Sequence, residues 1–105
     1  MGDLKQTLEA IDGATDAFFC GYDGMVIENV PGRVETESIA AYCATAFKHF
    51  KIEDNQFKEM ICLFERSMLV VRWLEDGFVG VCMGLDGNIG RAKLELNKYG
   101  RRFYK

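Results

Sequence analysis

The segment from Gln56 to Gly84 constrains the fold more than any other part of the chain. It contains three apolar runs, Phe57–Phe64, Met68–Leu74 and Phe78–Met83, which are separated only by short polar segments. Runs rich in β-branched and aromatic residues with such short connections are typical of an antiparallel meander. In the middle run apolar side chains occupy both alternating sets of positions, so both faces of the sheet need a cover. The sequence therefore predicts an antiparallel sheet with helices on both faces.

A second antiparallel pair is predicted nearer the N-terminus. Ala14–Gly21 and Met25–Asn29 flank the tripeptide Tyr22-Asp23-Gly24, whose Asp-Gly pair tolerates the positive φ of a tight hairpin. Phe18-Phe19-Cys20 is a continuous apolar run, as in strands that are buried on both faces. We therefore expect this hairpin to join the meander in one sheet.

Three other segments have the apolar spacing and end signals of helices. The first begins at Asp3 and ends at Asp12-Gly13, the second spans Glu35–Lys51, and the third follows Asp86-Gly87-Asn88. The expected order is α-β-β-α-β-β-β-α, an α+β fold in which three helices cover both faces of a five-stranded antiparallel sheet. If Gly90 lies inside the last helix, it costs roughly 1 kcal/mol relative to alanine.

Length and composition place the chain among globular proteins. Because 105 residues is the usual size of one domain, we expect residues 1–105 to form a single domain. With 49% hydrophobic and 28% charged residues, the composition excludes a disordered chain. No apolar run approaches the ~18 residues of a membrane span, and the N-terminus lacks the regions of a signal peptide. The sequence therefore predicts a cytoplasmic protein without membrane insertion.

The four cysteines, Cys20, Cys43, Cys62 and Cys82, lie in apolar segments and show no CxxC spacing. Zinc sites are usually marked by closely spaced ligand pairs, whereas the one histidine, His49, is six residues from its nearest cysteine. We therefore expect buried, reduced thiols and neither a metal site nor a cofactor. The sequence places no nucleophile beside His49, so no catalytic residue is predicted.

Arg72 lies in an otherwise apolar predicted strand. A buried guanidinium needs a carboxylate or a route to solvent. Glu59 or Glu65 on a neighbouring strand can supply the carboxylate. The alternative is an arginine finger that acts on a bound phosphate.

The chain resembles the Roadblock/LC7 family, including bacterial and archaeal regulators of small GTPases of the MglB type. The resemblance covers nearly the whole chain, from Leu4 to Phe103, and implies a profilin-like fold. Apolar spacing and turns carry it, in the segments Leu4–Gly13, Gly21–Gly24, Met25–Ile27, Ile39–Phe50, Leu69–Arg72 and Leu85–Leu96.

The resemblance implies a dimer that acts on other proteins. In such proteins the third strand pairs across a two-fold axis and the second helices pack together, within a homodimer or with a related Roadblock protein. The expected dimer interface comprises Ala41, Thr45, Phe57, Glu59, Ile61 and Leu63. The expected contact with a small Ras-like GTPase comprises Tyr42, Thr45 and His49. The family brings no catalytic residues.

Two other functions remain open at this point. A small-molecule sensor would show a cavity of about 300 Å³ or more between helix and sheet. A nucleic-acid binder would use the C-terminal segment from Asp86 onwards, which has six basic and two acidic residues. Cations near a helix C-terminus also complement the helix dipole, and we do not expect a nucleic-acid partner.

Overall fold

The computed structural model describes residues 3–49 and 58–103. The elements of this part of the chain follow the predicted order α-β-β-α-β-β-β-α. They are α1 (Asp3–Glu9), β1 (Ala14–Gly21), β2 (Val26–Val30), α2 (Val34–His49), β3 (Glu59–Leu63), β4 (Ser67–Trp73), β5 (Gly77–Gly84) and α3 (Ile89–Phe103). The predicted third strand was too long, because Lys58 and Phe64 flank β3 without belonging to it.

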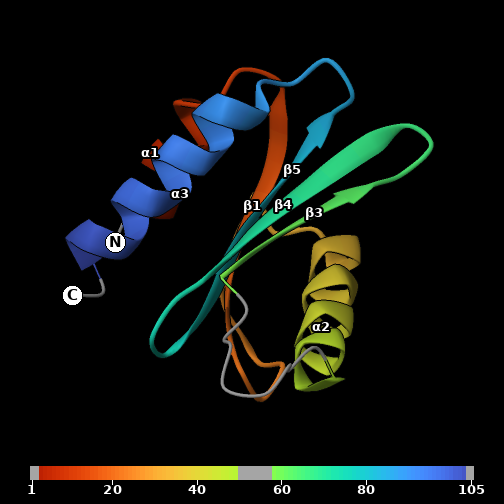
Figure 1. Ribbon diagram of the computed structural model, residues 1–105, viewed down its shortest axis with the longest axis vertical. Helices are drawn as coiled ribbons and strands as arrows, with labels where there is room; N and C mark the ends of the chain where they lie inside the picture. Colours follow the sequence, from red (N-terminus) through yellow and green to blue (C-terminus); the bar gives the residue numbers. More distant parts are fainter. Residues whose placement is uncertain (1–2, 50–57, 104–105) are drawn as a thin grey trace.

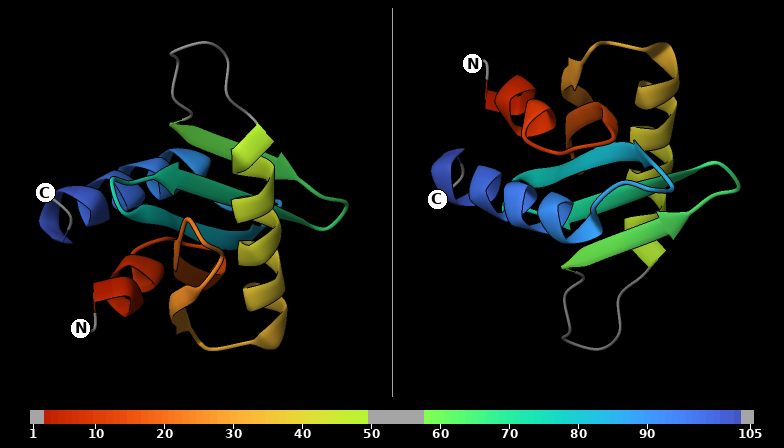
Figure 2. Two further views of the ribbon diagram at one scale, coloured as in Figure 1. Left: turned by 90° about the horizontal axis from the view of Figure 1, so that it is seen from below. Right: turned by 90° about the horizontal axis from the view of Figure 1, so that it is seen from above.

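The strands form one five-stranded sheet in the order β2-β1-β5-β4-β3, and each neighbouring pair is antiparallel. Figure 1 shows α1 and α3 on one face of this sheet and α2 on the other. Figure 2 shows the same layers from below and from above. The α+β fold with helices on both faces is therefore confirmed, and β2 and β3 are the two edge strands of the described sheet.

The core consists of two apolar clusters separated by the sheet. The adjacent residues Phe18 and Phe19 of β1 point to opposite faces, as the side-chain alternation of a strand requires. Phe19 packs against Tyr99 of α3, with ring centroids 6.0 Å apart. Phe18 packs edge-to-face on Phe78 of β5 on the α2 side, with centroids 6.1 Å apart. The continuous apolar run in β1 is thus explained by burial on both faces.

The ends of two elements carry the turn chemistry expected from the sequence. Gly24 has a φ of 88°, and the N–H of Gly21 donates to the Met25 carbonyl at 3.0 Å across the β1–β2 turn. At the start of α3, the Asn88 side-chain oxygen accepts the backbone N–H of Arg91 at 2.9 Å. Gly90 is the second residue of α3 and therefore does not interrupt the helix interior.

Within the described ranges, no helix is long and apolar enough to cross a membrane.

Candidate functional site: the α2–β3 surface

The edge strand β3 exposes apolar side chains on one face. Glu59, Ile61 and Leu63 point towards the face that carries α3, whereas Met60 and Cys62 point towards α2. Ile61 is 42% exposed and Leu63 is 73% exposed. An apolar edge strand whose backbone groups are free is a template for pairing with another strand. The described part of the chain places no further strand beyond β3.

Helix α2 is apolar on more than the face that packs on the sheet. Ala40, Cys43 and Phe47 are buried against the sheet, and the Phe47 ring lies 4.2 Å from the Trp73 ring by centroids. On the outward side, Tyr42 is 77% exposed.

The other predicted helix residues lie beside Tyr42. Ala41 and Thr45 are exposed, and the Thr45 hydroxyl donates to the Ala41 carbonyl at 3.2 Å. The exposed side of α2 therefore combines one large aromatic ring with small side chains, which suits packing against another helix.

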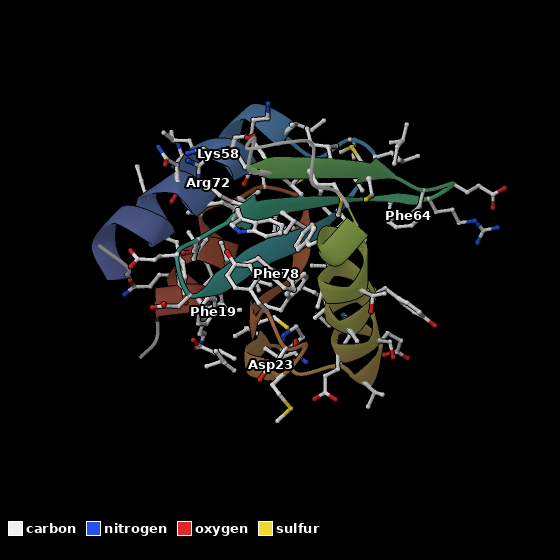
Figure 3. The ribbon with its side chains drawn as sticks, turned by 60° about the horizontal axis from the view of Figure 1, so that its bottom comes forward. Phe19, Asp23, Lys58, Phe64, Arg72 and Phe78 are labelled. Carbon is white, nitrogen blue, oxygen red and sulfur yellow. The ribbon has the colours of Figure 1, made fainter. Side chains whose placement is uncertain are left out.

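An apolar groove of ≈ 610 Å³ separates α2 from β3. Its walls carry almost no polar surface, and it opens to solvent. It is lined by Ile39, Tyr42, Cys43 and Ala46 of α2, by Met60, Ile61 and Cys62 of β3, and by Phe64 and Leu69. Figure 3 shows Phe64 beyond the end of β3, close to α2. We call β3, this groove, and Ala41, Tyr42 and Thr45 of α2 the α2–β3 surface.

The position of α2 over the sheet explains the groove. α2 packs most closely on β1 and β2, at the opposite side of the sheet from β3. Ile39, Cys43 and Ala46 form one apolar stripe of α2, and the structure places this stripe along the groove. Periodicity identifies the apolar side of a helix, yet it does not say which strands that side covers.

Glu59 forms ion pairs within its own chain. Its carboxylate lies 3.9 Å from the Arg72 guanidinium and 3.6 Å from the Lys93 ammonium of α3. The two strands pair with Glu59 directly opposite Arg72, so the carboxylate partner is Glu59, one of the two residues predicted for this role. Figure 3 shows Lys58 and Arg72 near each other at the opposite end of β3 from Phe64.

The described cations of α3 are also paired. Arg91 and Lys98 lie 3.2 Å and 3.4 Å from the Glu95 carboxylate, and Lys93 pairs with Glu59. Each cation of α3 whose side chain is described therefore has a carboxylate neighbour. This pairing weakens the case for a phosphate-binding helix, which presents unpaired cations.

All four thiols are free. Burial, with a smaller contribution from Asp23, raises the pKa of Cys20 to about 11. Burial, with smaller contributions from the other three thiols, raises the pKa of Cys43 to about 12. Burial also raises the pKa of Cys62, and it raises that of Cys82 to about 11, where Asp16 adds to the shift. Cys62 and Cys82 are only half-buried, so the expectation of full burial was wrong for these two residues. Cys62 of β3 is partly exposed because no described element covers this strand beyond the groove.

The structure places the described residues of the predicted site on α2 and on β3, the two elements that flank the groove. Tyr42 and Ile61 both contribute to the lining of the groove, although the alternation of β3 directs the Ile61 side chain to the face that carries α3. Phe57 lies outside the described residues, and the side chain of His49 is not among those described. The sequence interpretation missed two residues that line the groove, Met60 and Phe64. Both are apolar and lie in or next to an edge strand, and this combination could have indicated them. In the described part of the chain, no three His, Cys, Asp or Glu residues are placed to hold a metal ion.

Comparison of the sequence with known proteins gives no match, either to a protein-family model or to a curated protein. The fold does match solved structures. An MglB with a tetrameric arrangement superposes with a TM-score of 0.81 at 19% identity, covering 93% of this chain and 79% of that one.

Two further structures place the fold more broadly. A Roadblock/LC7 domain from Streptomyces avermitilis matches with a TM-score of 0.80 at 13% identity, covering 94% of this chain and 89% of that domain. Profilin II from Acanthamoeba castellanii matches with a TM-score of 0.72 at 14% identity, covering 96% of this chain and 93% of the profilin. The chain therefore has a profilin-like Roadblock/LC7 fold similar to that of MglB.

Proposed function

We propose that this chain is a non-enzymatic, dimeric regulator or adaptor that binds a small Ras-like GTPase. The observation that carries the proposal is the α2–β3 surface, where an apolar edge strand and an exposed tyrosine lie next to each other on a Roadblock fold. The resemblance of the sequence to GTPase regulators and the likeness of the fold to MglB support the same conclusion. Residues 1–105 form a single domain in this proposal, since the described strands share one sheet.

The GTPase contact is proposed at the outward side of α2, through Tyr42, Thr45 and His49. Tyrosine supplies contact area together with a polar group, and it is common among the residues that dominate interface energies. A regulator needs no catalytic side chain, because it acts if it binds one conformation of the GTPase switch segments more tightly than the other.

Binding should therefore depend on the nucleotide state of the GTPase. We expect at least a tenfold difference in Kd between the GTP-loaded and GDP-loaded forms, which corresponds to about 1.4 kcal/mol. Calorimetry against candidate small GTPases measures it. Tyr42→Ala should weaken binding to the preferred form, whereas Leu94→Ala, at an exposed site on α3, should not. Equal affinity for both forms would reduce the protein to a passive adaptor, and no binding to any candidate would contradict the proposal.

The groove favours one second candidate, a small-molecule sensor. Its volume of ≈ 610 Å³ is within the range of ligand sites, and its lining selects an apolar, uncharged ligand. An uncharged solvatochromic dye such as Nile red tests this reading. Dye binding that is lost in Ala46→Trp, which fills the groove, and kept in Thr45→Trp, which points outward, would support a sensor. If the dye binds neither the wild type nor a monomeric variant, the small-molecule sensor function is contradicted.

A further inference from the structure

The first turn of α2 contacts a buried carboxylate that belongs to another element. Asp16 lies in β1, and its side chain is only 7% exposed. The Thr36 hydroxyl donates to Asp16 Oδ2 at 3.0 Å, and the Arg33 guanidinium lies 3.4 Å from the same oxygen. Thr36 is the third residue of α2, and Arg33 directly precedes the helix. A charged group of the sheet is thus paired with the start of α2.

A second side chain of the sheet holds the residue before α2. Asn29 of β2 donates from Nδ2 to the Arg33 carbonyl at 3.0 Å, and the Thr36 N–H donates to the same carbonyl at 3.2 Å. Arg33 stands at the N-cap position, but its side chain has no oxygen that could accept a helix N–H. Side chains of β1 and β2, rather than a capping side chain of the helix, therefore hold the start of α2 in place.

The other end of α2 is held by aromatic packing. The Phe47 ring lies 4.2 Å from the Trp73 ring and 4.9 Å from the Phe78 ring by centroids. Between the two ends, the buried residues of α2 that pack on the sheet are short: Ala40, Cys43 and Ala44. Short side chains interdigitate less than long ones, so they resist a sideways shift of the helix only weakly. The contacts at the two ends therefore determine where α2 lies.

We propose that Asp16 is a positioning residue for α2, because its carboxylate holds the start of the helix over β1 and so sets the distance between α2 and β3. A buried carboxylate without partners is strongly disfavoured, so α2 cannot shift without a loss at Asp16. The groove leaves space on the β3 side into which the helix would otherwise move. In treating α2 as the partner-binding helix, this inference rests on the proposed function. The placement of α2 itself can be tested without any partner.

The two partners of Asp16 contribute unequally. Thr36 is 2% exposed, whereas the Arg33 side chain is 60% exposed. A buried hydrogen bond to a charged group is stronger than an ion pair that water and salt screen. Thr36→Val keeps the shape of the side chain and removes the hydroxyl, so it should displace α2 more than Arg33→Gln does. Thr36→Ser keeps the hydroxyl and should behave like the wild type.

Labelling of the folded full chain with iodoacetamide at one fixed pH measures the displacement of α2. Cys43 is 5% exposed beneath the helix, and peptide mass spectrometry gives its labelling rate separately from those of the other cysteines. We expect this rate to rise at least about tenfold in Thr36→Val, because α2 then opens locally. Trp73, the one tryptophan of the chain, gives a second measurement. Its emission should shift to longer wavelengths when the Phe47 ring moves away.

Asn88→Ala is the matched control, because it removes a helix-end hydrogen bond on α3 and leaves the contacts of α2 intact. If Thr36→Val labels Cys43 no faster than this control and leaves the Trp73 emission unchanged, Asp16 contributes to stability alone and the proposal is overturned. Equal rates in Thr36→Ser and Thr36→Val would also overturn it.

Asp16→Ala provides a second test that does not depend on the folding of Thr36→Val. It removes the carboxylate and leaves no unpaired charge in the core, and it should raise the labelling rate of Cys43 as Thr36→Val does. A wild-type rate in Asp16→Ala would contradict the proposal. These measurements use no GTPase, so failure to bind a GTPase and failure of this inference are distinguishable.

Discussion

Buried thiols link single residues of this chain to the stability of the whole fold. The pKa of Cys43 is raised from 9.0 to about 12, mainly by burial and to a smaller extent by the thiols of Cys62, Cys82 and Cys20. In the unfolded chain the same thiol loses its proton near its ordinary pKa. The folded state therefore holds a proton that the unfolded state has released once the pH exceeds 9.0.

The sign of the resulting pH dependence follows directly. The contribution of Cys43 to stability is complete below its unfolded pKa and is lost as the pH rises towards its folded pKa. We expect the free energy of unfolding to fall by up to about 1.4 kcal/mol per pH unit for each such thiol. Urea unfolding at about pH 8.5 and pH 10.5, followed by Trp73 fluorescence, measures it. Cys43→Ala should show a smaller fall, and an unchanged fall would contradict the assignment.

Individual contacts were predictable where the partners lie on neighbouring strands. The meander pattern predicts a carboxylate partner for Arg72 on a neighbouring strand, either Glu59 or Glu65, and the register of β3 against β4 selects Glu59. Lys93 also contacts Glu59, yet it comes from a helix whose position is set by tertiary packing. No local pattern indicates that second ion pair.

At the scale of elements, the sequence predicts helices and strands well because turn and capping residues mark their ends. The Asp-Gly turn and the Asn88 cap lie where the sequence predicts them. The groove was not predictable, because it depends on where α2 crosses the sheet. Hydrophobic periodicity identifies Ile39, Cys43 and Ala46 as an apolar stripe, but their exposure depends on the distance between α2 and β3.

The Asn88 cap gives a test at this scale. Asn88→Ala removes the acceptor of the Arg91 N–H and should lower the stability by about 1 kcal/mol, which shifts Tm by roughly 4 °C in a chain of this size. Thermal unfolding followed by circular dichroism measures the change. Asn88→Asp keeps an oxygen acceptor and should stay close to the wild type. A loss in Asn88→Asp equal to that in Asn88→Ala would show that the cap is not the cause.

At the scale of the whole molecule, the two edge strands of the sheet differ in how readily another strand can pair with them. β2 is a five-residue strand followed by Pro31, a residue that lacks an N–H and ends the ladder. β3 is equally short, but it lies beside an apolar groove and exposes Ile61 and Leu63. Pairing through β3 would hide apolar surface and backbone groups together, so we expect self-association at this edge rather than at β2.

A charge at the centre of β3 should therefore dissociate the proposed dimer. Ile61→Glu places two carboxylates opposite each other on the two-fold axis, and we expect its dissociation constant to rise at least tenfold, about 1.4 kcal/mol. Leu94→Glu is the matched control, because Leu94 is 46% exposed and Ile61 is 42% exposed, but Leu94 lies on α3 away from the edge. Gel filtration with light scattering over a dilution series should give monomers for Ile61→Glu and dimers for Leu94→Glu. If both variants stay dimeric, the copies associate elsewhere, and if both dissociate, the loss is not specific to β3.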